Sequence, residues 1–100
     1  MNTYTEEKIH SELKNLEDWK YKTNAIEKKF TLANFKETLA FMVRIGFEAE
    51  AANHHPEWTN IYNKLSIRLS THDAGGITEK DFALAKKIDQ IASAHNHSTS

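Results

Sequence analysis

The sequence predicts an α+β domain in which a four-stranded antiparallel sheet carries three helices on one face, in the order helix, strand, strand, helix, strand, strand, helix. Two pairs of short segments rich in aromatic and β-branched residues are each joined by a tight turn, which is typical of β-hairpins. Three other segments repeat apolar residues at helical spacing. Two hairpins separated and flanked by helices favour an α+β arrangement.

The first helix is expected from about Glu6 to Leu16, with Thr3 or Thr5 as its N-cap. The first hairpin follows, because aromatic or β-branched residues alternate with lysine in 19–23 and an apolar segment resumes in 26–30.

A longer second helix is expected after Thr31, which can serve as its cap. Its apolar residues follow one another along one side of the helix, and they are Phe35, Leu39, Met42, Val43 and Gly46. This helix should end near Ala52 or Asn53, because the residue before Pro56 avoids the helical region.

The second hairpin is predicted from the strand-like segments Trp58–Tyr62 and Leu65–Ser70, joined by Asn63 and Lys64. Alternation along the second segment places Leu65, Ile67 and Leu69 on one face, and Arg68, Ser70 and His72 on the polar face.

The last helix begins with a capping box, in which Thr78 is the cap and Asp81 stands where glutamate is usual. Its buried side is expected to consist of Leu84, Ala85, Ile88, Ile91 and Ala92. The polar tail 95–100 is expected to fray.

Composition indicates a single domain, 1–100, with a formal charge of −1 from 13 basic and 14 acidic residues. This even balance does not favour nucleic-acid binding, and a small molecule or a protein is the expected partner. The chain has no cysteine and no long apolar run, so we expect a cytoplasmic protein without a disulfide, signal peptide or membrane span. The open face and edges of a small sheet favour a homo-oligomer.

Three of the six histidines, His54, His55 and His72, fall into one short stretch beside a proline and aromatic residues. Imidazoles transfer protons near neutral pH, so this cluster predicts an acid/base site. Glu50 lies one turn before His54 and is expected to pair with it. Trp58 is a candidate for stacking on a flat ligand, although packing within the sheet explains it equally well.

Simpler interpretations apply to the other candidates. The pair His54 and His55 is also consistent with an exposed connection, and Asp81 is needed for its capping box in any case. His10, His95 and His97 are expected at the solvated surface.

Other chemistries are disfavoured. Adjacent histidines normally project in different directions, and no HExxH or CxxC motif accompanies them, so no metal is expected. The chain also lacks a thiol, a Gly-x-Ser-x-Gly elbow and a phosphate-binding loop.

At these residues the sequence resembles the pterin-4a-carbinolamine dehydratases. The resemblance rests on Glu50-x-x-x-His54-His55-Pro56, Tyr62, His72 and Asp81, and covers the chain from Trp19 to about Ile91. It implies a four-stranded sheet with three helices, a dimer or tetramer, and dehydration of 4a-hydroxytetrahydropterin to the quinonoid dihydropterin, in support of aromatic amino acid hydroxylases. The pterin is then the substrate, and no cofactor is implied.

The resemblance also suggests roles. His54 and His72 are expected to transfer protons, with His55 orienting the pterin, Glu50 and Asp81 supporting the imidazoles, and Trp58 lining the pocket. The alternative function is a non-catalytic interaction module, because some members of this family act as dimerisation cofactors of a homeodomain transcription factor.

Overall fold

The computed structural model describes residues 2–98, with side chains described as far as His95. It contains three α-helices and a four-stranded antiparallel sheet, which confirms the predicted α+β fold and order of elements. The elements are α1 (Glu6–Leu13), β1 (Lys20–Lys22), β2 (Ala25–Thr31), α2 (Phe35–Ala52), β3 (Glu57–Ile61), β4 (Lys64–Leu69), a short 3-10 turn (His72–Ala74) and α3 (Glu79–Ser98). The strand order is β1-β2-β4-β3, so β1 and β3 form the edges of the sheet.

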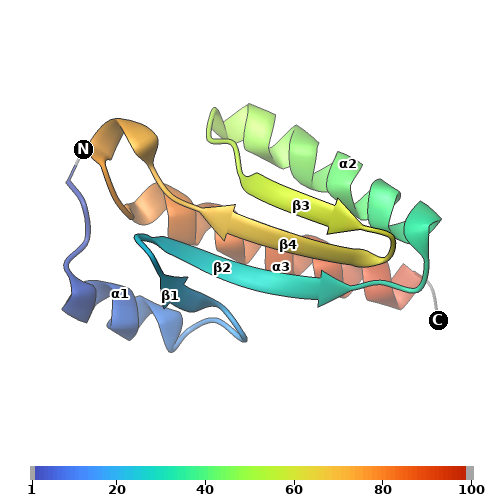
Figure 1. The fold of residues 1–100 in the computed structure, drawn as a ribbon, viewed down its shortest axis with the longest axis horizontal. Coiled ribbons are helices and arrows are strands. Elements are labelled where there is room, and N and C mark those ends of the chain that lie inside the picture. The colour runs from blue at the N-terminus through green and yellow to red at the C-terminus, as the bar shows by residue number, and fades with distance from the viewer. Residues whose placement is uncertain (1, 99–100) are drawn as a thin grey trace.

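One face of the sheet is covered by helices and the other is open. In Figure 1 the open face is toward the viewer, with α3 behind β2 and β4, α2 along the β3 side and α1 beside β1. The covered face contributes Ile26, Leu65, Ile67 and Leu69 to the core, where they join Phe41 and Ile45 of α2 and Ala85 and Ile88 of α3. The predicted alternation along β4 is therefore confirmed, and so is the predicted buried side of α3, except that Ala92 is only partly buried.

Two tight turns set the register of the strands. Thr23 and Asn24 both have positive φ, 51° and 60°, as a type I′ hairpin turn between β1 and β2 requires. The turn between β3 and β4 consists of Tyr62 and Asn63, one residue earlier than predicted, because Lys64 already pairs with Ile61 and Thr31 in the sheet.

The structure corrects several helix boundaries. α1 ends at Leu13 rather than near Leu16. Thr31 is the last residue of β2, and Asn34 instead caps α2, since its side-chain oxygen accepts a hydrogen bond of 2.9 Å from the Glu37 amide. α3 continues as far as Ser98, through most of the segment predicted to fray.

His95 was predicted at the surface, but it is buried on α3, with Nε2 3.0 Å from a carboxylate oxygen of Glu37. The extra helical turns of α3 carry it against α2, which explains the difference. The side chain of His97 lies outside the described residues.

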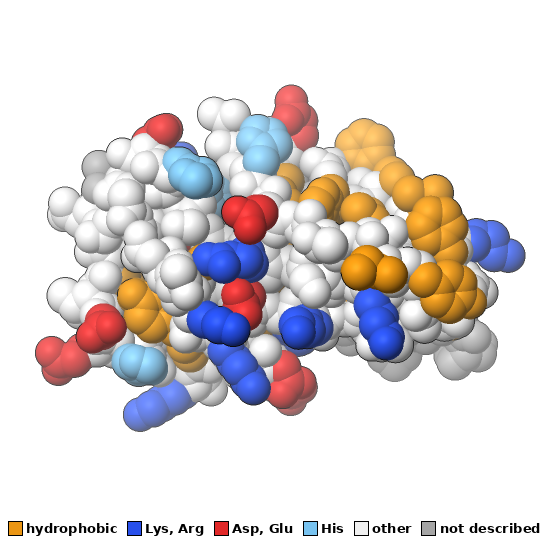
Figure 2. Space-filling view, in the orientation of Figure 1, with side chains coloured by type: hydrophobic (Ala, Val, Ile, Leu, Met, Phe, Trp, Pro, Cys, Tyr) orange, Lys and Arg blue, Asp and Glu red, His pale blue; other side chains and the backbone are white. Residues whose placement is uncertain are grey.

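α2 packs through a narrower face than its composition suggests. Its buried residues are Thr38, Phe41, Ile45 and Ala49. A second apolar row at four-residue spacing remains exposed, and consists of Phe35, Leu39, Val43 and Phe47. Figure 2 shows apolar side chains gathered on the side of the molecule where α2 and the β3–β4 turn lie. We call this row the α2 apolar stripe.

The described part of the chain holds no helix with both the length and the apolar character that a membrane crossing requires.

Candidate active site

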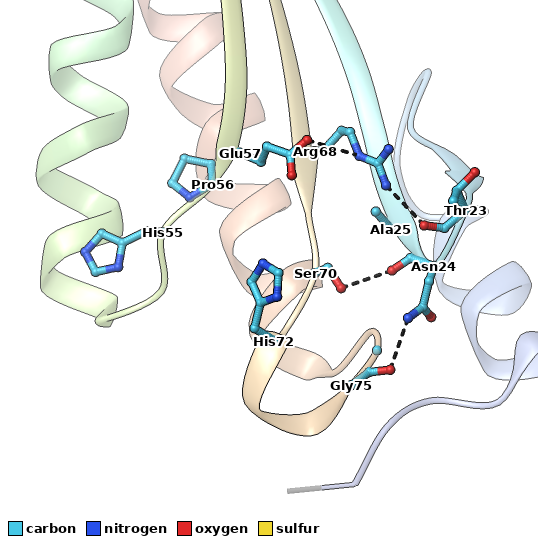
Figure 3. Close-up of a pocket in the computed structure, with 11 residues that line it drawn as sticks. Thr23, Asn24, Ala25, His55, Pro56, Glu57, Arg68, Ser70, His72 and Gly75 are labelled. Carbon is cyan, nitrogen blue, oxygen red and sulfur yellow. Dashed lines mark hydrogen bonds and ion pairs between the residues drawn. The ribbon is translucent and has the colours of Figure 1, made fainter.

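A cavity of about 520 Å³ opens where the ends of β2, β3 and β4 meet the loop after α2. This volume falls in the range of small-molecule sites. Its walls come from the β1–β2 turn, the loop that enters β3, the end of β4 and the following turn: Thr23, Asn24, Ala25, His55, Pro56, Glu57, Arg68, Ser70, His72, Gly75 and Gly76. Figure 3 shows His55 and His72 on separate segments beside this space.

The end of α2 decides where the two adjacent histidines point. Asn53 adopts the left-handed conformation, with φ 50° and ψ 43°. The amide of Asn53 donates to the Glu50 carbonyl, and the amide of His54 donates to the Ala49 carbonyl. These are the two hydrogen bonds of a Schellman motif, which reverses the chain direction at the helix end. His54 and His55 consequently leave the helix in different directions.

His54 points into the protein and binds Asp81. Its side chain is 8% exposed, and Nε2 lies 2.6 Å from Oδ1 of Asp81, which is fully buried in the first turn of α3. The other carboxylate oxygen accepts hydrogen bonds from the Thr71 hydroxyl at 2.8 Å and the Thr78 amide at 2.9 Å. The predicted capping box is thus confirmed, and the same carboxylate joins α2, α3 and the segment before His72.

His55 points outward and binds Glu50. Its Nε2 lies 2.8 Å from Oε1 of Glu50, and the two side chains are 59% and 80% exposed. An ionised carboxylate can only accept a hydrogen bond, so Glu50 holds the tautomer of His55 that is protonated at Nε2. The other ring nitrogen, Nδ1, then has its lone pair available.

The predicted pairing of Glu50 with His54 is therefore wrong. It assumed that the helix continues to His54, whereas the left-handed Asn53 ends it and exchanges the two partners. The carboxylate of Asp81 binds His54, and the carboxylate of Glu50 binds His55.

His72 enters the cavity from the 3-10 turn after β4. Its imidazole is exposed, and no residue of the described chain forms a hydrogen bond or ion pair with it. The turn closes at Gly75, whose φ of 77° favours glycine and whose carbonyl accepts a 3.0 Å hydrogen bond from the Asn24 side chain. At Gly76, an added Cβ would lie 3.1 Å from the Thr3 side chain, so this turn is also closely packed.

Trp58 lies away from the cavity. It pairs with Ile67 on the covered face of the sheet, where it packs against the core. Its indole therefore serves packing, the alternative that the sequence left open, and it does not line the predicted pocket.

Several cavity residues were not predicted as site residues. Alternation along β4 placed Arg68 and Ser70 on the same face as His72, and this pattern alone could have identified both as site residues. Glu57, Thr23 and Asn24 reach the cavity only through the cross-strand register and the reversed turn, which single-sequence patterns do not specify.

No group of three or more potential metal ligands gathers in the part of the chain that the structure describes.

The known proteins that this chain resembles agree with one another in family. Residues 2–91 match the family model described as pterin 4 alpha carbinolamine dehydratase. A protein of Christiangramia forsetii, provisionally named a pterin-4-alpha-carbinolamine dehydratase, is 50% identical over 96% of this chain and 99% of its own length. A similarly named protein of Opitutus terrae is 46% identical over 88% of this chain and 92% of its own length.

Solved structures show the same fold. A transcriptional coactivator/pterin dehydratase from Brucella melitensis superposes with a TM-score of 0.88 at 35% identity, over 91% of this chain and 99% of that chain. A pterin dehydratase-like protein, described as a RuBisCO assembly factor of the α-carboxysome, has a TM-score of 0.61 at 23% identity, over 74% of this chain and 86% of that chain.

Proposed function

Because the chain belongs to the pterin-4-alpha-carbinolamine dehydratase family, we propose that it removes water from 4a-hydroxytetrahydropterin and releases the quinonoid dihydropterin. The observation that carries this proposal is that two histidines, His55 and His72, line one cavity from separate segments (Figure 3). The physiological role that follows is recycling of the pterin used by aromatic amino acid hydroxylases.

The reaction needs one proton delivered and one removed. The C4a–O bond breaks as the hydroxyl gains a proton and leaves as water, and N5 loses its proton as the new C=N bond forms. In our proposal His55 is the base at N5, because Glu50 holds its Nε2–H and leaves Nδ1 as an acceptor. His72 is then the acid that protonates the departing hydroxyl.

We propose a role for His54 that differs from the one suggested by its motif. Its Nε2 is occupied by Asp81, and it does not line the cavity. We therefore assign it to positioning: it anchors the loop that carries His55. Proton transfer at a carbinolamine needs neither a metal nor an organic cofactor, and the pterin enters this scheme only as substrate.

The direct test is turnover of freshly generated 4a-hydroxytetrahydropterin, followed by its absorbance. Wild-type protein should accelerate its decay, and His55→Ala or His72→Ala should each lower the rate by about 10²-fold or more, the usual contribution of a general acid or base. His10→Ala is the matched control, because His10 is an exposed histidine on α1 beside Tyr21. A wild-type protein that does not accelerate the decay would refute the proposal.

The protein is also proposed to form a homo-oligomer. The α2 apolar stripe leaves Phe47 73% and Val43 52% exposed, and β3 beside it is an edge strand with unpaired backbone groups. A second copy presents the same apolar row, so a two-fold arrangement can bury both rows together. The Brucella protein is described as a transcriptional coactivator as well as a dehydratase, which makes a different protein the alternative occupant of this surface.

A further inference from the structure

Glu57 and Arg68 lie opposite each other on β3 and β4, on the open face of the sheet, and both line the cavity. The guanidinium Nε is 3.8 Å from Oε2 of Glu57, which is too long for a hydrogen bond. Nε is nevertheless buried, and it has no hydrogen-bond acceptor within the described chain. A buried N–H without an acceptor destabilises a folded protein, so a ligand that supplies the acceptor would be favoured here.

The rest of Arg68 is held in place. Nη2 donates a 3.1 Å hydrogen bond to the carbonyl of Thr23 in the β1–β2 turn, and Nη1 lies 3.6 Å from Oε2 of Glu27 on β2. These contacts fix the planar guanidinium from the side of β2, while its Nε edge is turned toward Glu57, as Figure 3 shows. A donor fixed in advance loses little conformational entropy when it binds a ligand.

Glu57 complements this donor. Its side chain is 75% exposed, and its carboxylate forms no hydrogen bond within the described chain. The rim of the cavity therefore places the guanidinium of Arg68, whose side chain is 33% exposed, next to a two-oxygen acceptor.

A pterin presents the opposite pattern along one edge of its pyrimidine ring. The 4-oxo group accepts a hydrogen bond, and the neighbouring N3–H and 2-amino group both donate. Arginine and carboxylate side chains read such patterns on nucleic-acid bases, where arginine donates to ring carbonyls and carboxylates accept from amino groups.

We propose that Glu57 and Arg68 recognise the 2-amino-4-oxopyrimidine edge of the substrate, with Arg68 donating to the 4-oxo group and Glu57 accepting from N3–H and the 2-amino group. This inference rests on the proposed function and adds to it: the two residues bind and orient the ring, and the histidines carry out the proton transfers. The site then accepts 2-amino pteridines and rejects 2-oxo pteridines, whose second carbonyl would face the Glu57 carboxylate.

The test compares two stable probes, 7,8-dihydropterin and its 2-oxo counterpart 7,8-dihydrolumazine, by calorimetric titration. Wild-type protein should bind the 2-amino probe about 10- to 100-fold more tightly, as expected for a two-point contact that becomes repulsive in the wrong ligand. Glu57→Gln should bind both with similar affinity, because an amide can donate to a 2-oxo group as readily as it can accept from a 2-amino group.

Glu27→Gln is the matched control. It removes a carboxylate at a comparable distance from the same guanidinium, but Glu27 does not line the cavity, so the preference for the 2-amino probe should remain. Arg68→Lys keeps the charge and removes the planar fork, and it should raise KM about tenfold with a smaller change in kcat.

Three results would overturn the inference: a wild-type protein without preference, a Glu57→Gln variant that retains it, or a Glu27→Gln variant that loses it to the same extent. If wild-type protein turns over the carbinolamine in any of these cases, the dehydratase proposal still stands. A wild-type protein that neither binds the 2-amino probe nor accelerates dehydration would remove both.

Discussion

Replacing Asp81 with asparagine should destabilise the protein far more than any other change to a histidine–carboxylate pair in the cavity region. Asp81 is fully buried, and its two oxygens accept hydrogen bonds from His54, Thr71 and Thr78 at 2.6, 2.8 and 2.9 Å. Asparagine keeps the volume but loses the charge, and its amide group presents a donor to a partner that also donates.

The expected loss in the free energy of unfolding follows from these hydrogen bonds. A hydrogen bond to a charged group contributes roughly 1.5–3 kcal/mol to stability, against roughly 0.5–1.5 kcal/mol for a neutral one, so the change weakens each bond by about 1 kcal/mol. The three bonds together give a loss of about 3 kcal/mol in the free energy of unfolding. For a domain of this size that corresponds to a fall in Tm of roughly 12–24 °C.

The matched control is Glu50→Gln, which alters the other histidine–carboxylate pair. That pair is 59% and 80% exposed, and exposed ion pairs contribute only about 0–1 kcal/mol. Urea unfolding followed by circular dichroism measures both variants under the same conditions. Equal losses in the two variants, or a loss under about 1 kcal/mol for Asp81→Asn, would show that the buried carboxylate does not hold these segments together.

Three further outcomes are expected. Prolonged treatment with a chelator should leave turnover unchanged, because the proposed proton transfers use imidazoles alone; stoichiometric zinc that restores a lost activity would contradict this. Phe47→Glu should shift the oligomer toward monomer in light scattering after size-exclusion chromatography, since it places a charge in the α2 apolar stripe, whereas Glu7→Lys on α1 should leave the mass unchanged. Asn53→Ala should lower the free energy of unfolding by about 1 kcal/mol because of its positive φ, and Asn53→Gly should be close to neutral; equal effects would show that the left-handed conformation is unimportant.

The fold could be predicted from the sequence because its signals are local. The alternation of Leu65, Ile67 and Leu69 determined the buried face of β4, and the capping box of Thr78 and Asp81 located the start of α3. The predictions of element boundaries were wrong where tertiary contacts determine the local structure. Thr31 is an acceptable cap by residue type, but pairing with Lys64 keeps it in the sheet.

Of the residues predicted for the site, His55 and His72 line the cavity, whereas His54 and Trp58 do not. The motif identified His54, His55 and His72, but the Schellman turn at Asn53 determines which of the first two lines the cavity. Asparagine is tolerated in the left-handed conformation, and this was the one local signal for the reversal. The contact between Glu57 and Arg68 depends on strand register, which requires both hairpins to be placed.

The buried network explains how the two histidines proposed to transfer protons, His55 and His72, can be held in place on separate segments of so small a domain. His54 and Thr71 both bind the Asp81 carboxylate, and each directly precedes a cavity residue, His55 or His72. One buried carboxylate therefore fixes the backbone on both sides of the cavity, at positions adjacent to the two imidazoles. The exposed imidazoles need few contacts of their own, because the loops that carry them are already anchored. In the proposed mechanism, His54 therefore acts on the reaction through the placement of His55, and its loss should weaken stability and turnover together.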